Sequence, residues 1–354
     1  MRTPRLYVYV AVCAFVTLFL GNTLFGGPWR GMASNPLLAS YGHKQKAFND
    51  PTFISSIPQK YVPTLENNRR LVVVGDIHGM YDELNELLNK VDFNPDTDHL
   101  VATGDMISKG PDSSAVVALL MELDASAVRG NHENNVLLAW AQANGVRTDT
   151  KAKEKHLATA KTLSMEQLEW LANRPLILSV TPLPILIVHG GLVPGLTLVK
   201  QDSWAIMNMR SLLMDTGAHK HQSKARGDAS DSEHSNSPRD STISKKRAKS
   251  KPEPAQVDYT VGIPSSSRNG VMWADAWNHH QKFVKDIERR TVIYGHDAKS
   301  GLRQGDYTVG LDSDCAGGGA LTAMIINAAD KDEGFKQHIV QTVCKQPDSN
   351  KAST

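Results

Sequence analysis

Short apolar runs recur along the middle of the chain, and most of them stop at a turn that carries Asp, His or Asn. The first run, residues 71–74 (LVVV), stops at Gly75 and is followed by Asp76 and His78. Residues two positions apart in an extended segment point to the same side, so Asp76 and His78 could hold one ion together. Six such stretches predict β-strands that end in turns. They are residues 71–79, 99–105, 126–133, 176–180, 185–192 and 291–301.

Helical periodicity appears between these runs. The apolar positions within 84–91 fall at i, i+3, i+4 and i+7, which predicts an amphipathic helix directly after the first turn. Similar spacing predicts a helix over 116–123, and Ser164 with Gln167 forms a capping box for a helix that ends near Ala172. Alternating strands and helices indicate an α/β domain, in which ligands gather at the carboxyl ends of the strands.

The N-terminal segment is apolar in a different way, because residues 6–25 carry no charge. That length can cross a bilayer as a helix, and Arg2 and Arg5 favour a cytoplasmic N-terminus. A cleaved secretion signal is the alternative. Residues 215–256 are polar and almost without apolar side chains, which predicts a disordered insertion. The predicted organisation is a cytoplasmic tip and signal-anchor at 1–29, a stem at 30–68, a folded domain at 69–345 that contains the insertion, and a tail at 346–354.

Net charge and cysteine content exclude few classes of protein. The 354-residue chain has a formal net charge of +2, which does not indicate a nucleic-acid-binding protein. Three cysteines are too few for a disulfide framework. Cys13 lies in the apolar N-terminal segment, so Cys315 and Cys344 could pair or remain reduced. The basic run at 244–251 is either a solvated loop or an attractor of anionic substrate or lipid.

The turns together offer a set of ligands that suits a metal centre. The set is Asp76, His78, Asp105, Asn131, His132, His189 and His296. Mixed imidazole and carboxylate ligands suit zinc, manganese or iron better than calcium. A single catalytic zinc needs three protein ligands, so this set is large enough for two ions that share an aspartate. Any one of these residues could instead be a helix cap or a buried core histidine; it is their joint occurrence that predicts two metals.

Five motifs, in order, carry a family resemblance. GDIHG, GDMISKGPDS, GNHE, HGGL and YGHDAKSG resemble those of the calcineurin-like metallophosphatases of the phosphoprotein-phosphatase type, over about residues 69–322 apart from the insertion. KGPDS, GHDAKSGL and the N-terminal segment are most similar to the ApaH-like branch and its fungal vacuolar endopolyphosphatases. The resemblance implies two mixed β-sheets sandwiched by helices, preceded in this chain by one transmembrane helix.

The resemblance also implies roles for the turn residues. Two divalent metal ions are expected, zinc first, with manganese, cobalt or iron as alternatives. The implied ligands are Asp76, His78 and Asp105 for the first ion, and Asp105, Asn131, His189 and His296 for the second. His132 is the implied general acid, and Lys109 and Asn131 are the implied contacts to substrate phosphate.

Two positions depart from the family pattern GDxxDRG. Ser108 stands where the family has an aspartate that orients the catalytic histidine, and Lys109 replaces an arginine, which keeps the charge but loses the bidentate fork. Expelling an alkoxide demands strong proton donation, whereas a phosphate leaving group, with a second pKa of about 6, demands far less. Ser108 therefore favours a phosphoanhydride substrate.

Other candidates remain open. The family's second phosphate-binding arginine has no matching motif in this chain, and the candidates are Arg268, Arg289, Arg290 and Arg303. Asp275 is a further candidate near the metals, while Glu133 is expected to serve the backbone, Asp112 to cap a helix, and Asp297 to support His296 from outside.

The sequence therefore predicts a phosphohydrolase that cleaves inorganic polyphosphate internally, or another phosphoanhydride. A serine/threonine protein phosphatase is one alternative, and a catalytically silent, membrane-tethered polyanion-binding protein is another. The implied location is the vacuole membrane, single-pass type II with the catalytic domain in the lumen; secretion or another endomembrane lumen is the alternative.

Overall fold

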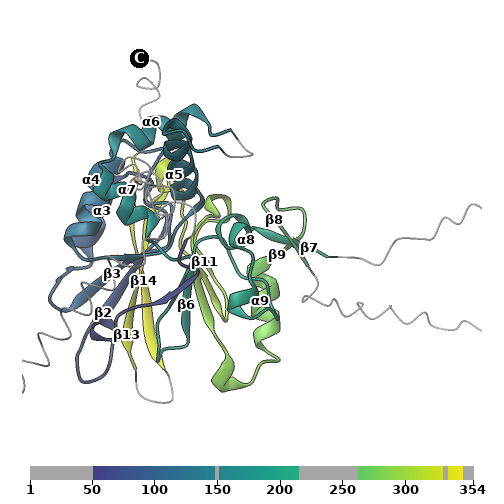
Figure 1. The fold of residues 1–354 in the computed structure, drawn as a ribbon. Helices are drawn as coiled ribbons and strands as arrows, with labels where there is room; N and C mark the ends of the chain where they lie inside the picture. Colours follow the sequence, from purple (N-terminus) through teal and green to yellow (C-terminus); the bar gives the residue numbers. More distant parts are fainter. Residues whose placement is uncertain (1–50, 148–150, 215–261, 330–333, 346–354) are drawn as a thin grey trace, which may run out of the picture. The chain divides into compact units, whose positions relative to one another are not determined.

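The computed structural model describes residues 51–147, 151–214, 262–329 and 334–345 (Figure 1). The predicted anchor at 6–25, the insertion at 215–256 and the tail at 346–354 lie outside these ranges. Within them, no helix combines the length and the apolar character that a bilayer span requires.

The first sheet has five strands in the order β14-β13-β2-β3-β4. Its strands are β2 Arg70–Val74, β3 Asp98–Ala102, β4 Ser126–Ala127, β13 Ala320–Ala328 and β14 Phe335–Val343. β2, β3 and β4 are parallel, whereas β13 runs antiparallel to both β2 and β14. The carboxyl ends of the three parallel strands therefore meet at one edge.

The second sheet has six strands in the order β1-β5-β6-β10-β12-β11. They are β1 Ile54–Ser56, β5 Ile177–Ser179, β6 Ile185–Val188, β10 Thr291–Tyr294, β11 Arg303–Gln304 and β12 Thr308–Gly310. β6, β10 and β12 are parallel, and β5 pairs antiparallel with β6. Both sheets are therefore mixed.

The predicted stem at 30–68 is too long. β1 pairs in parallel with β5, and Ile57 and Val62, which follow it, are almost fully buried. The strand has only three residues, two of them serines, so it gives no apolar periodicity that a sequence reading could detect. The folded domain therefore begins before residue 69.

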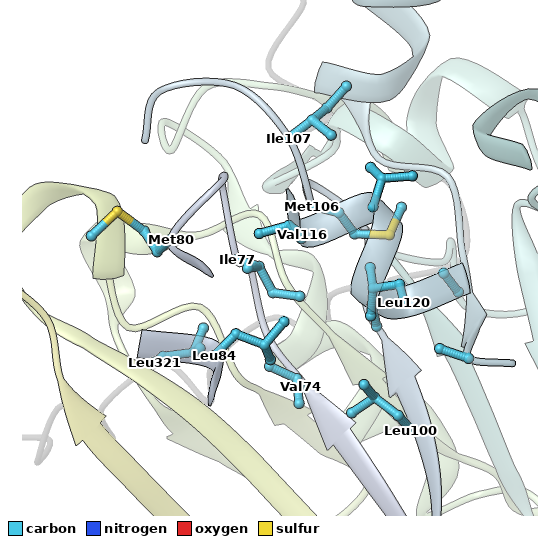
Figure 2. Packing of buried hydrophobic residues seen from close by; sticks show 14 of the residues in the cluster. Val74, Ile77, Met80, Leu84, Leu100, Met106, Ile107, Val116, Leu120 and Leu321 are labelled. Carbon is cyan, nitrogen blue, oxygen red and sulfur yellow. The ribbon is translucent and has the colours of Figure 1, made fainter. Parts of the chain in front are cut away.

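The layers follow from the alternation of side chains along the strands. Leu71 and Val73 face the second sheet in a shared apolar core, whereas Val72 and Val74 face helices on the opposite side. That helical layer, part of which Figure 2 shows, consists of α3 Tyr81–Lys90, α4 Ser113–Glu122, α5 Asn131–Ala143, α6 Glu154–Thr162 and α7 Met165–Ala172. α8 Ser203–Asn208 and α9 Trp273–Gln281 cover the outer face of the second sheet. Two sheets thus pack face to face between helices, as predicted.

Local capping follows the sequence prediction. Asp112 accepts a hydrogen bond from the backbone N–H of Ala115 and caps α4. Ser164 and Gln167 form the predicted capping box of α7, which ends at Ala172. Short 3-10 helices complete the chain at η1 Gln59–Tyr61, η2 Leu198–Lys200, η4 Asp286–Glu288, η5 Ala298–Ser300 and η6 Cys315–Gly317.

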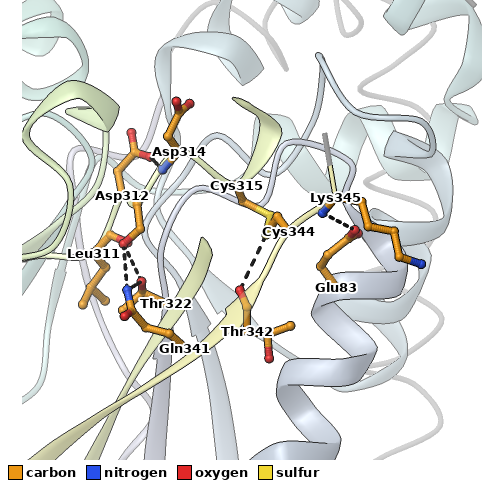
Figure 3. The surroundings of a disulfide bond; sticks show 11 residues. Glu83, Leu311, Asp312, Asp314, Cys315, Thr322, Gln341, Thr342, Cys344 and Lys345 are labelled. Atoms are coloured by element: carbon orange, nitrogen blue, oxygen red, sulfur yellow. Dashed lines mark hydrogen bonds between the residues drawn. A yellow bond between two sulfur atoms is a disulfide. The ribbon is translucent and has the colours of Figure 1, made fainter. Parts of the chain in front are cut away.

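A third, small sheet was not predicted. β7 Ser211–Leu213 pairs antiparallel with β8 Ile263–Ser265 and with β9 Val271–Met272, which leads into α9. Cys315 and Cys344, whose pairing the sequence left open, form a disulfide that ties the turn after β12 to the end of β14 (Figure 3).

Candidate metal centre

All six predicted ligands lie near strand ends that meet. Asp76 and His78 follow β2, Asp105 follows β3, and Asn131 opens α5 shortly after β4. His189 follows β6 and His296 follows β10, so the two sheets contribute from opposite sides. The described residues contain two groups of possible metal ligands whose donor atoms lie within 4.8 Å of one another, and both groups include Asp105.

The first group is His78, Asp105 and His132. Oδ2 of Asp105 lies 3.6 Å from Nε2 of His78 and 4.0 Å from Nε2 of His132. Asp76 adjoins the group, with its Oδ2 3.9 Å from Nε2 of His78. His132, predicted as a proton donor rather than a ligand, therefore lies only slightly farther from Asp105 than the ligand His78 does.

The second group is Asp105, His189 and His296. Oδ1 of Asp105 lies 3.3 Å from Nε2 of His189, and Oδ1 of Asn131 lies 3.0 Å from the same nitrogen. Asp105 thus turns one oxygen toward each group. This is the arrangement that one aspartate shared by two ions requires.

Hydrogen bonds to the backbone orient the imidazole rings. Nδ1 of His78 lies 3.0 Å from the carbonyl oxygen of Ile107, and Nδ1 of His189 lies 2.9 Å from that of Thr103. Because a carbonyl oxygen only accepts, each Nδ1 carries the hydrogen and each Nε2 keeps its lone pair toward the site. In His296 the roles are reversed, since its Nε2 lies 3.0 Å from the carbonyl oxygen of Asn208.

The ligand-bearing turns have left-handed backbone. His78, Asp105 and His296 have φ of 49°, 49° and 69°, and Ser108 and Lys109 have 72° and 68°. Such conformations cost roughly 1–3 kcal/mol each and persist where the surrounding structure enforces them. Their concentration at these turns indicates that the geometry is maintained for a function.

Glu133 holds two of the turns together, as predicted. Its carboxylate accepts hydrogen bonds from the backbone N–H groups of Asp105, Met106, Ile107 and Gly130. Both oxygens are occupied by these contacts. Glu133 therefore serves the backbone rather than a metal.

The electrostatics of the site fit divalent cations. Burial opposes charge on Asp105, yet the imidazoles, His189 first, hold the pKa of its carboxyl well below its usual range. Burial lowers the pKa of His78 to about 3 and that of His132 to about 4. An ionised carboxylate beside the neutral imidazoles of His78 and His132 is the protonation state that metal ions bind, whereas Asp105 raises the pKa of His189 against the effect of burial.

Two residues at the site were not identified from the sequence. Asp312, 5% exposed, follows β12, and its carboxylate acts on the pKa of Asp76. Burial, and then the charge of Asp312, raise the pKa of Asp76, as expected for buried like charges in contact. A cation beside the pair would remove that repulsion. Asp312 follows a strand as the other ligands do, and this signal could have revealed it.

Arg210 is the second residue that was missed. Its Nη2 donates to the carbonyl oxygen of His296 at 3.0 Å, and its Nε lies 3.7 Å from Oδ1 of Asp297. Arg268 also contacts Asp297, whereas Arg303 pairs with Asp275 on the surface. No local motif marks Arg210 in the sequence, because it reaches the site from the segment after α8.

The remaining candidates from the sequence do not contribute ligands to the metal centre. Asp275 is exposed and paired with Arg303, so it does not join the ligands, and Trp273 and Trp277 belong to the core. Arg289 pairs with Asp286 across η4, which follows α9. Asp297, expected to support His296, instead contacts Arg210 and Arg268.

The two positions that depart from the family pattern also lie at the site. Nζ of Lys109 lies 2.6 Å from Nε2 of His78. Oγ of Ser108 and Nδ1 of His132 are both buried, and neither has a hydrogen-bond partner among the described residues. Nδ1 of His132, which the aspartate of the family pattern would hold, therefore has no acidic partner here.

Comparison with known proteins agrees with this geometry. Residues 69–300 match the family model described as calcineurin-like phosphoesterase. The symmetrical bis(5'-nucleosyl)-tetraphosphatase of Erwinia tasmaniensis is 37% identical over 124 residues, which cover 34% of this chain and 44% of that protein. Its counterpart in Aeromonas hydrophila subsp. hydrophila is 39% identical over 125 residues, which cover 34% and 44%. The chain thus spans less than half the length of these curated relatives.

A solved structure extends the likeness in fold. The crystal structure described as a "putative diadenosine tetraphosphatase" superposes with a TM-score of 0.57 at 23% identity, and covers 84% of this chain and all of that one. At this identity the match bears on the fold alone. The family model covers well over half of the chain and includes every predicted ligand, so this protein belongs to the calcineurin-like phosphoesterase family.

Proposed function

We propose that this protein is a metal-dependent phosphohydrolase that cleaves phosphoanhydride bonds, with inorganic polyphosphate, cut internally, as its substrate. The observation that carries the proposal is the pair of ligand groups that share Asp105 at the meeting point of the two sheets. The relatives whose names state a bis(5'-nucleosyl)-tetraphosphatase activity support the anhydride class.

The chain's own residues divide between two ions. Asp76, His78 and Asp105 would hold the first, and Asp105, Asn131, His189 and His296 the second. Zinc is the leading assignment, with manganese, cobalt or iron as alternatives. Bound there, two divalent ions supply Lewis-acid stabilisation of phosphoryl oxygens and lower the pKa of water.

Protein side chains would complete the chemistry. His132 is positioned to give a proton to the leaving oxygen, and Lys109, Arg210 and Asn131 would bind the phosphate. With Ser108 in place of an acidic partner, nothing among the described residues supports a charged His132 at its Nδ1. A leaving group that needs little protonation, such as a phosphate, is therefore favoured over a serine alkoxide.

The test uses the purified full-length chain with long-chain polyphosphate, with and without zinc, manganese or cobalt. Products of intermediate length on a gel are expected, and Asp105→Asn, which removes the shared carboxylate, should abolish both hydrolysis and the binding of two metal equivalents. Release of orthophosphate alone would argue against internal cleavage. Preference for a phosphoserine peptide would indicate a protein phosphatase, and metal binding without any turnover would indicate a silent polyanion-binding protein.

Location remains part of the proposal. The uncharged segment at 6–25 would anchor the chain in the vacuole membrane with the domain in the lumen, where polyphosphate would be its partner. Fractionation of cells that carry the tagged full-length chain, followed by carbonate extraction, tests this.

A further inference from the structure

Two guanidinium groups share one carboxylate beside the metal centre. Asp297, which directly follows the ligand His296, has its Oδ1 in contact with Nη2 of Arg268 and 3.7 Å from Nε of Arg210. Its Oδ2 accepts a hydrogen bond from Oγ of Ser300 at 2.6 Å. One carboxylate therefore contacts two guanidinium groups.

The two arginines differ in their contacts with the ligands. Arg210 donates to the carbonyl oxygen of His296. Burial lowers its pKa, while the carboxylates of Asp312, Asp105 and Asp76 act in the opposite direction, so Arg210 lies within their field. Burial and the charge of Arg210 lower the pKa of Arg268, and the charge of Asp312 opposes the shift. Arg268 contacts Asp297, whereas Arg210 also contacts the ligand His296.

Hydrogen bonds hold the turn that presents Arg268. The turn connects β8 to β9, and Oγ of Ser211 donates to the carbonyl oxygen of Ser267 at 2.9 Å. The backbone N–H of Ser267 donates to Oγ of Ser265 at 3.1 Å. A side chain on a pre-ordered turn loses less freedom when it binds a ligand.

Both guanidiniums retain capacity for an anion. Nε of Arg210 and Nε of Arg268 are buried and have no hydrogen-bond partner among the described residues, so a ligand would meet the outer guanidinium nitrogens instead. The side chains are 26% and 32% exposed, so a ligand can approach them. Guanidinium forks match phosphate oxygens in geometry as well as in charge.

We propose that Arg268 forms a second phosphate subsite, which binds the phosphate next to the scissile one in an oligophosphate chain. This subsite rests on the proposed function, because it is the neighbour of the phosphate that Arg210 would hold at the metals. A substrate with one phosphate leaves the subsite empty, whereas an inorganic chain or a dinucleoside tetraphosphate fills it. The subsite therefore selects chains over monoesters.

The experiment compares Arg268→Gln with wild type in kcat/KM for p-nitrophenyl phosphate, tripolyphosphate and diadenosine tetraphosphate. A charge-assisted hydrogen bond at a partly exposed site corresponds to about tenfold. The variant is expected to lose about tenfold more on the two oligophosphates than on the monoester, and Arg268→Lys, which keeps the charge without the fork, should lose less. Arg303→Gln, which breaks a surface pair with Asp275, is the matched control and should leave the ratio unchanged.

Inhibition of monoester hydrolysis by tripolyphosphate tests the subsite independently of the proposed function. Tripolyphosphate is titrated as an inhibitor of p-nitrophenyl phosphate hydrolysis, and its Ki should rise about tenfold in Arg268→Gln even if the chain is never cleaved. Failure of wild type to cleave any anhydride would refute the function while the Ki still tests the subsite. An equal loss on all three substrates, an unchanged Ki, or a loss confined to diadenosine tetraphosphate would overturn the subsite.

Discussion

Removal of the disulfide between Cys315 and Cys344 should destabilise the domain and make the turn that carries Asp312, beside the metal centre, less ordered. Cys315 lies in η6, three residues after Asp312, and both sulfur atoms are buried. Figure 3 shows the bond beside the turn that carries Asp312. The same turn has a hydrogen bond from the N–H of Asp314 to Oδ1 of Asp312 at 3.1 Å. The disulfide therefore restrains the turn that carries Asp312, a carboxylate at the candidate metal centre.

The size of the effect follows from the loop that the bond closes. The cysteines are 29 positions apart, and the loss of loop-closure entropy in the unfolded chain gives about 3.6 kcal/mol of stabilisation. For a domain of this size, that corresponds to a fall in melting temperature of roughly 10 °C. Each alanine also removes a small buried side chain and adds to the loss.

The assay is urea unfolding of Cys315→Ala/Cys344→Ala, followed by tryptophan fluorescence, with the free energy of unfolding extrapolated to water. Dithiothreitol should reproduce most of the loss in wild type and have no effect on the double variant. Metal affinity measured by calorimetry should also fall, because Asp312 is no longer held against Asp76. A double variant within about 1 kcal/mol of wild type would refute the loop-closure argument, and unchanged metal affinity would refute the link to Asp312.

Two further predictions concern proton chemistry. Ser108→Asp should raise turnover of a phosphoserine peptide relative to polyphosphate, because it gives Nδ1 of His132 an acidic partner. Aspartate tolerates the φ of 72° at this position. A wild-type preference for the phosphopeptide would contradict the reasoning. Burial lowers the pKa of His99 to about 4, below the unfolded value of about 6.5, so the stability that depends on neutral His99 is complete above pH 6.5 and is lost as the pH falls toward 4. Between pH 7 and pH 5 wild type should lose about 2 kcal/mol more than His99→Gln in chemical denaturation, and equal losses would show that His99 does not titrate as described.

Much of the fold and most of the candidate site could be predicted because both depend on local patterns. An apolar run followed by a turn predicted β2, β3, β6 and β10, and the polar residues of those turns meet at the site. Capping by Asp112 and Ser164 was equally local and is confirmed. A ligand whose position is set by the end of its own strand can be found from the residues on either side of it.

Residues whose position depends on contacts distant in sequence could not be predicted in this way. Arg210 reaches His296 across 86 positions of sequence and is preceded by no strand. β1 is a strand only because β5 offers a free edge beside it. In both cases the determining partner lies elsewhere in the chain, and the surrounding sequence carries no periodicity that would indicate it.

The glycines of the motifs show that the sequence nevertheless carries a signal of some contacts between residues far apart in the chain. Gly75 has no positive φ, so its own turn does not require glycine. A Cβ there would lie 2.5 Å from the carbonyl oxygen of Leu311, which directly follows β12 of the second sheet. At Gly295 a Cβ would lie 2.0 Å from Oδ1 of Asp76. Each glycine therefore makes room for a residue on another strand end. The first glycine of GDIHG therefore reflects a contact between two strand ends, and the strand end that it meets also carries Asp312, the residue after Leu311.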